Sequence, residues 1–233
     1  MAVAPRKPPA TVSRAPSSAI AKRGSAARAL HSALRRGGVG PPVNGVFDVN
    51  ERCIEMLVNA AREERAGSFA LVADLRELLK SLDPAMRQRA ARCAFLLADM
   101  ELGNGDWWHV AHTHPTQPIR TPPWRGSFPR PSAIQLARAT LLLAWNSLRV
   151  DPATTQILLG LTTPVAEVIV ALRLDEIDRI ARTRFRHIRP RWDDRPAVWQ
   201  RLLIAAQKGD EELLTEFNLH ALQLLIGELI PAS

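Results

Sequence analysis

Three histidines and one aspartate lie close together near the middle of the chain. Asp106, His109, His112 and His114 have side chains that bind metals, because imidazole and carboxylate groups both suit zinc. Metal motifs of this kind gain their specificity from a helix that places two ligands on one face. Six prolines between residues 103 and 131 favour an irregular loop instead. We therefore expect packed or solvated histidines and no metal, with a zinc site as the alternative.

Other chemistry-bearing patterns are missing from the sequence. It contains no GxSxG elbow, no glycine-rich phosphate loop and no CxxC pair. Cys53 and Cys93 fall on apolar sides of expected helices, which favours buried thiols. The adjacent carboxylates at 63–64 and 193–194 lie near expected helix ends, where capping is their ordinary use. We expect neither an enzyme nor a cofactor.

Positive charge is concentrated at the start of the chain. The first 40 residues contain no acid, and the 23 basic and 23 acidic residues that follow cancel. This composition predicts a disordered basic arm over 1–46 that holds DNA phosphates. A solvated tail without a partner and a transit peptide are the alternatives. The bases assigned to DNA here are Arg6, Lys7, Arg14, Lys22, Arg23, Arg28, Arg35 and Arg36.

A second basic run comes late in the chain, at residues 182–191. Its arginines alternate with other residues and so do not share one helix face. We expect an extended connector that presents the charges to phosphate, which arginine binds through a bidentate fork. The alternative is that these arginines pair with acids of neighbouring helices. The run contributes Arg184, Arg186, Arg189 and Arg191 as expected DNA-binding residues.

The rest of the pattern predicts an all-α protein. Residues 47–103 read as a small bundle of three helices, starting at Asp48, Ser68 and Asp83-Pro84. The third of these is expected to continue to about Gly103. Residues 104–131 form a Pro/Trp/His-rich connector whose tryptophans we expect to pack against the helices.

Residues 132–233 are expected to form a second helical domain. A helix capped by Ser132 is so apolar that it must lie at the centre of the domain or in a dimer interface. Asp151-Pro152 predicts a short helix to Leu159, and Gly160 predicts a left-handed helix end. Further helix starts are predicted at Thr163-Pro164, Leu174, Asp194–Pro196 and Asp210.

The C-terminal part of the chain resembles the FlhD family of flagellar transcriptional activator subunits. The resemblance runs without a gap from Leu141 to Asp193 and resumes at Leu213–Leu225, including His220. It covers about the last hundred residues. The matching pieces are Leu141–Ala144, Asp151, Leu159-Gly160, Ala171-Leu172, Leu174 and Arg191–Asp193.

The resemblance implies a helical dimer that assembles with an FlhC-like protein, binds promoter DNA and recruits RNA polymerase. It also implies that the corner at Asp151, Ile157 and Leu158 contacts the partner, with His220 and Leu225 of the last helix. The family's intersubunit cysteine corresponds to Ile188, so we expect a homodimer without a disulfide, joined through residues 134–148.

The sequence thus predicts a cytoplasmic, DNA-associated regulator without a membrane-spanning segment. A helical adaptor that binds proteins without touching DNA is the first alternative. An FlhD-like regulator of a mobile element or secretion system is the second.

Overall fold

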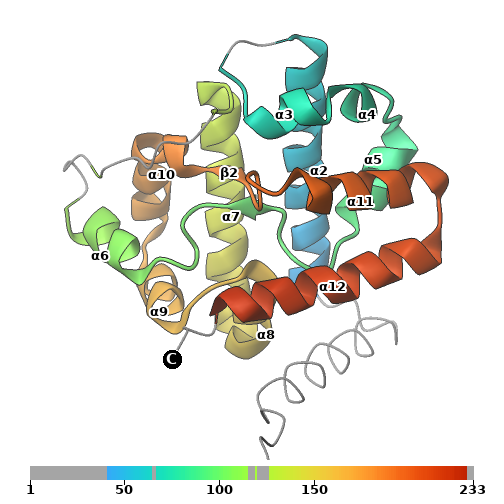
Figure 1. Cartoon of the computed structure of the whole chain (residues 1–233). Coiled ribbons are helices and arrows are strands. Elements are labelled where there is room, and N and C mark those ends of the chain that lie inside the picture. Colours follow the sequence, from blue (N-terminus) through green and yellow to red (C-terminus); the bar gives the residue numbers. More distant parts are fainter. Residues whose placement is uncertain (1–40, 65–66, 115–118, 120–125, 230–233) are drawn as a thin grey trace, which may run out of the picture.

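The computed structural model describes residues 41–64, 67–114, 119 and 126–229 (Figure 1). The predicted arm lies outside this range, except that residues 41–46 belong to the first described helix. The described chain is all-α, as predicted, with one short strand pair.

The first helices confirm one predicted start and correct two others. α2 (Pro41–Arg62) runs through Asp48, which is therefore no cap. A single helix expected from Ser68 is instead two short ones, α3 (Ala70–Asp74) and α4 (Arg76–Lys80). α5 (Pro84–Ala91) begins as predicted, because the carboxylate of Asp83 accepts a 2.7 Å hydrogen bond from the amide of Met86.

The chain becomes extended after α5, whereas the sequence predicted helix to about Gly103. Residues 93–100 are all buried and include the strand β1 (Ala98–Asp99). β1 pairs antiparallel with β2 (Arg189–Pro190), which brings Asp99 opposite Arg189. The apolar run at 93–100 is short enough to form either a helix or a buried strand. Its contacts with distant parts of the chain stabilise the extended form.

The connector predicted at 104–131 contains a helix that the sequence did not predict. α6 (Gly105–Thr113) is capped by Asn104, whose side chain accepts a 3.0 Å hydrogen bond from the amide of Trp107. The prolines that argued against a helix begin only at Pro115, after α6 has ended. Trp107 and Trp108 are buried, as the composition predicted.

Four helices follow: α7 (Arg130–Val150), α8 (Pro152–Leu159), α9 (Thr163–Ala171) and α10 (Leu174–Thr183). Ser132 lies inside α7 and does not cap it. Asp151 caps α8 by accepting a 3.0 Å hydrogen bond from the amide of Thr154. Gly160 ends α8 with a φ of +67°, a conformation that costs glycine little. Both features confirm the prediction for this corner.

The 3-10 turn η1 (Phe185–His187) leads to β2 and then to α11 (Pro196–Lys208) and α12 (Glu211–Leu229). Asp210 caps α12 as predicted, with its side chain 3.0 Å from the amide of Leu213. α12 crosses the front of the molecule in Figure 1.

The helices of both predicted units share one buried core. α7 stands beside α2 at the centre of the fold and also packs against α8, α9 and α10. The bundle predicted at 47–103 and the domain predicted at 132–233 therefore pack against each other through a common core. Neighbours from the same chain cover the buried face of α7, as expected for a helix at the centre of the fold.

Both cysteines are buried thiols, as predicted. Burial disfavours the thiolate and raises the pKa of Cys53 to about 12, and it raises the pKa of Cys93 as well.

Within the described residues, no single helix is long and apolar enough to cross a membrane. The pair α8 and α9 passes this test jointly, by length and composition, but it bends by 113° between the two helices. Leu158, Leu159, Val165 and Ile169 of this pair are buried inside the protein.

Candidate functional site

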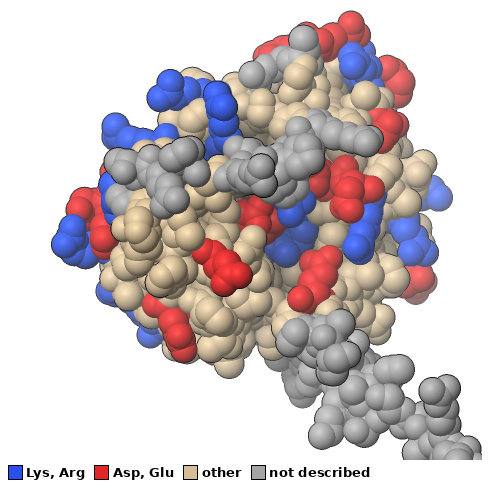
Figure 2. All heavy atoms as spheres, turned by 60° about the vertical axis from the view of Figure 1, so that its left-hand side comes forward, with Lys and Arg blue, Asp and Glu red and all other residues tan. Residues whose placement is uncertain are grey.

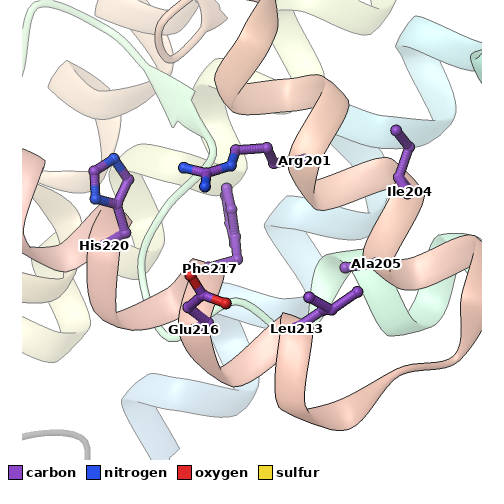
Figure 3. Close-up of a pocket in the computed structure, with 7 residues that line it drawn as sticks. All are labelled: Arg201, Ile204, Ala205, Leu213, Glu216, Phe217 and His220. Carbon is purple, nitrogen blue, oxygen red and sulfur yellow. The ribbon is translucent and has the colours of Figure 1, made fainter.

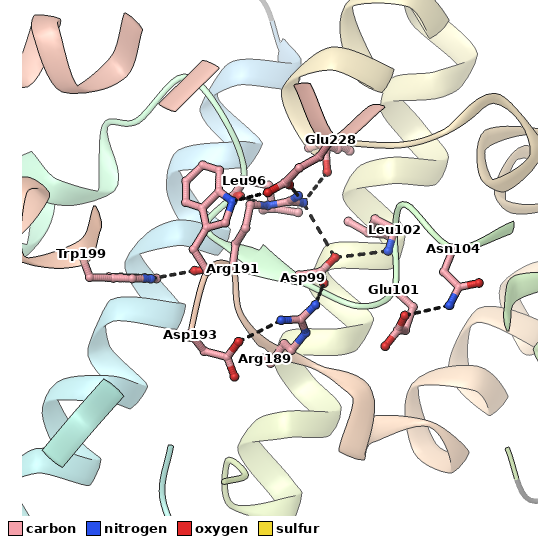
Figure 4. A network of polar contacts seen from close by, with 12 residues as sticks. Leu96, Asp99, Glu101, Leu102, Asn104, Arg189, Arg191, Asp193, Trp199 and Glu228 are labelled. Atoms are coloured by element: carbon pink, nitrogen blue, oxygen red, sulfur yellow. Dashed lines mark hydrogen bonds and ion pairs between the residues drawn. The ribbon is translucent and has the colours of Figure 1, made fainter. Parts of the chain in front are cut away.

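A network of charged side chains lies where β1 meets β2 (Figure 4). The guanidinium of Arg189 is 2.9 Å from the carboxylate of Asp99 and 2.8 Å from that of Asp193. Asp99 also accepts a hydrogen bond from the amide of Leu102. These contacts join the extended segment after α5 to the segment after α10.

Arg191 is the most deeply buried cation of this network. Its side chain donates hydrogen bonds to two main-chain carbonyls, that of Leu96 at 3.0 Å and that of Leu159 at 2.8 Å. Asp99 and Glu228 lie 3.9 Å and 4.0 Å from its guanidinium. One side chain therefore connects the buried strand, the end of α8 and the last turn of α12.

Burial and pairing act in opposite directions on these ionisable groups. Desolvation lowers the pKa of Arg191 and raises the pKa of Asp193, because it disfavours the charged form of each. Desolvation acts on Arg189 too, but attraction to Asp99 and Asp193 outweighs it and raises the pKa of that guanidinium. The network is best described as a structural clamp between parts of the chain.

The basic run at 182–191 is therefore not the extended, charge-presenting connector that the sequence predicted. Its first residues complete α10, and Arg189 and Arg191 point into the clamp. Arg184 is buried and donates a 3.1 Å hydrogen bond to the carbonyl of His114. Only Arg186 of the four arginines assigned to DNA is exposed. The alternative of pairing with neighbouring acids holds for Arg189 and Arg191.

The residues expected to contact a partner do not form one surface. Leu158 and Leu225 are buried in the core, and Asp151 serves as the cap of α8. Ile157 lines an open groove of about 910 Å³ between α6, α8, α9 and the end of α12. His220 lines a different groove of about 400 Å³ between α11 and α12, with Phe217 at its floor (Figure 3).

The histidines first considered as metal ligands lie on or just after α6. His109 and His114 are exposed, and His112 lies 3.7 Å from Glu176 of α10. Among the described residues, no group of three or more His, Cys, Asp or Glu side chains could hold a metal ion.

A buried histidine that the sequence did not single out lies beside α6. The ring of His187 packs 4.9 Å from that of Trp107, and its Nδ1 has no hydrogen-bond partner. Burial, with repulsion from Arg184, lowers the pKa of His187 to about 4.

Acidification should therefore destabilise the protein through His187. An unfolded histidine has a pKa near 6.5, so below that value the unfolded state binds the proton more tightly than the folded state. We expect the free energy of unfolding to fall by about 1–2 kcal/mol more between pH 7 and pH 5 in the wild type than in a His187→Phe variant. Urea unfolding at the two pH values measures the difference. Parallel losses in both proteins would contradict the assignment.

The face of the described core shown in Figure 2 carries charges of both signs. Acidic groups interrupt the basic ones on the side shown in Figure 2, so no continuous basic field covers it.

Comparisons of the chain with protein-family models, curated proteins and solved structures find no match. The resemblance of residues 141–193 and 213–225 to FlhD therefore stays a prediction.

Proposed function

We propose that this protein is a cytoplasmic, DNA-associated transcriptional regulator of the FlhD type. It acts with an FlhC-like protein at promoters, where it helps to recruit RNA polymerase. The basic arm supplies affinity for DNA, and the helical core supplies the contact with the protein partner.

The observation that carries this proposal is the local structure of the run that resembles FlhD. Residues 141–183 fold as consecutive packed helices, with the Asp151 cap and the Gly160 turn at one corner, and residues 185–193 form η1, β2 and a turn. Ile157 from this corner lines the open groove, and Pro164 and Leu229 line it too. An accessible groove with apolar residues suits a side chain from a protein partner.

The helical core offers few free arginines for binding DNA phosphates. We therefore assign DNA binding to the basic arm. Three of the four core arginines predicted to bind phosphate are buried or held by acids. The eight bases of residues 1–40 have no acid near them in the sequence. Contacts from such a segment are blind to DNA sequence and strongly dependent on salt.

A tethered reporter tests the partner contact without knowledge of the promoter. The chain is fused to an unrelated DNA-binding domain whose site lies upstream of a reporter gene. We expect activation by the wild type and at least a fivefold loss with Ile157→Asp, which places a charge in the groove. Leu213→Asp, an exposed apolar residue in the other groove, is the matched control and should activate normally. Equal activation by all three proteins would remove the groove from the mechanism.

Asp151→Asn separates a structural corner from a functional one. Asparagine caps a helix about as well as aspartate, so the melting temperature should change little. The pKa of Asp151 is lowered by its hydrogen bonds with Thr154, so the wild-type cap carries a negative charge at neutral pH. If the charge contacts the partner, reporter activation should fall about two- to threefold. Unchanged activation would limit Asp151 to its role as a cap.

The second candidate function is an adaptor that binds proteins and never touches DNA. The burial of Arg184 and Arg191 favours it, because these side chains cannot reach a phosphate in this fold. Retention of the intact protein on DNA decides between the two, since an adaptor would not be retained at physiological salt.

A further inference from the structure

The order of elements in the described chain repeats. A long helix, two short helices, a third helix, a two-residue strand and a further helix occur first as α2, α3, α4, α5, β1 and α6. A similar order recurs as α7, α8, α9, α10, β2 and α11, with the additional 3-10 turn η1 between α10 and β2. α3 and α8 do not occupy equivalent sequence positions. At an offset of 90 residues, α3 and α4 together correspond to the Gly160 turn and most of α9, whereas α8 corresponds to positions 62–69, between most of α2 and α3.

The buried positions repeat in register as well. The motif Ala-Arg-x-x-Phe occurs at Ala91–Phe95 and, 90 positions later, at Ala181–Phe185. The same offset joins two sets of core residues that are buried in both halves. These pairs are Val46 and Leu136, Asn50 and Thr140, Ile54 and Ala144, Leu57 and Ser147, Val58 and Leu148, Phe69 and Leu159, Leu71 and Leu161, Leu75 and Val165, Leu79 and Ile169, Leu82 and Leu172, and Ala90 and Ile180.

Backbone features outside the core match too. α5 and α10 have their N-caps at Asp83 and Arg173, again 90 positions apart. From the strands onward the offset is 91. Glu101 and Trp192 then correspond, and both have a φ of +56°, which is uncommon for residues other than glycine. The buried Trp108 and Trp199 correspond in the same way.

The two halves are arranged about an approximate twofold axis. In Figure 1, α3 and α4 lie at the top of the view and α8 and α9 at the bottom, while α6 and α11 lie on opposite sides. α2 packs against its counterpart α7, and β1 pairs antiparallel with its counterpart β2. Antiparallel pairing of equivalent segments is what a twofold axis produces at the centre of a dimer.

Segments that follow each half cross onto the other half. α12 follows α11, and its Asn218 accepts a 3.2 Å hydrogen bond from the amide of Ala94. His114 follows α6, and its carbonyl accepts the hydrogen bond from Arg184, the counterpart of Ala94. The crossing contacts thus fall at equivalent positions.

The interface between the two halves, called the seam here, is formed by β1 with β2 and by α2 with α7. Its charges are complementary only because the two halves differ in sequence. Asp99 and Glu101 come from the first half, and Arg189 and Arg191 come from the second. Two identical strands paired in the same register would place like charges together near the axis, which is destabilising. The clamp therefore favours pairing of a first half with a second half.

We propose that this chain is a tandem pair of related helical units folded as an intramolecular dimer, with the β1–β2 and α2–α7 seam as the dimer interface. One chain supplies both units, so the homodimer predicted from the FlhD resemblance is replaced by a monomer. This proposal rests on the repeat and the seam and does not depend on the proposed function in transcription.

Cysteines introduced across the seam show whether the halves pair within one chain. Ala98 and Pro190 are directly opposite in the strand register, so Ala98→Cys with Pro190→Cys places two thiols side by side. The buried Cys53 and Cys93 are poorly reactive, since their pKa values are raised. We expect mild oxidation to give a disulfide within a single chain and light scattering to give the 25.8 kDa mass of a monomer. A disulfide-linked dimer would overturn the proposal.

A cut between the units provides a second test that needs no change in the seam. A protease site replaces residues 120–125, and the folded full-length protein is then cleaved. We expect the two fragments to stay together in native buffer at micromolar concentration and to separate only in denaturant. Separation in native buffer would show that the seam is not a dimer-like interface and would overturn the proposal.

Discussion

Replacing Arg191 with methionine should lower the free energy of unfolding by about 3–5 kcal/mol, the usual cost of breaking a buried charged cluster on one side. The change removes the hydrogen bonds to the carbonyls of Leu96 and Leu159 and leaves both without this donor. It also removes one of the cations facing Asp99. Methionine fills much of the same volume, so the loss reports polar contacts more than packing.

Urea denaturation measures the loss in the free energy of unfolding of Arg191→Met, with Arg182→Met as the control variant. Arg182 is an exposed arginine nine positions earlier, and its replacement should change stability by less than about 0.5 kcal/mol. If the two variants were equally stable, the clamp would contribute nothing to holding the halves together.

Asn50→Leu should cost a similar amount, about 3–5 kcal/mol, through contacts that lie within the first half. The side-chain amide of Asn50 donates to the carbonyls of Ala91 at 3.2 Å and Phe95 at 2.9 Å. Its oxygen accepts a 2.7 Å hydrogen bond from the amide of Leu97. Leucine leaves these three main-chain groups buried and unpaired, at roughly 1–3 kcal/mol each.

The repeat provides the matched control for Asn50. Thr140 occupies the equivalent buried position in α7, and its hydroxyl has no hydrogen-bond partner. Thr140→Val should therefore leave stability within about 1 kcal/mol of the wild type. Thermal or urea unfolding of both variants measures the contrast, and a Thr140→Val loss as large as that of Asn50→Leu would contradict it.

The features that could be predicted from sequence are those with local causes. Asp83, Asp151 and Asp210 cap helices because a short side chain can reach a main-chain amide within its own first turn. Gly160 and Gly209 end helices because glycine tolerates a positive φ. None of these outcomes requires knowledge of distant parts of the chain.

The features that were missed have distant causes. The run after α5 is apolar enough for a helix, but Asn50 from α2 binds its carbonyls and holds it extended. The late arginines were expected to reach solvent, because nothing local reveals that Asp99 lies opposite Arg189. The unpredicted helix α6 had a local signal in Asn104, which the prolines that follow it outweighed.

One signal in the sequence does point to the seam. The Ala-Arg-x-x-Phe motif occurs twice, and each copy precedes one of the paired strands. Aligning the chain with itself on this motif brings β1 to within one residue of β2 from the amino-acid sequence alone. Asp99 follows the first copy of the motif, and Arg189 and Arg191 follow the second. Their opposite charges then suggest that these residues pair.

The salt dependence of DNA binding tests the proposed function most directly. The affinity of the intact protein for a DNA duplex is measured between 50 and 300 mM salt, beside a variant in which the eight bases of residues 1–40 are glutamine. We expect the intact protein to bind, with a slope of log affinity against log salt concentration that is steeper than the variant's by about 3–7 units, because each phosphate contact adds roughly 0.9. Equal slopes, or no binding by the intact protein at the lowest salt, would contradict it.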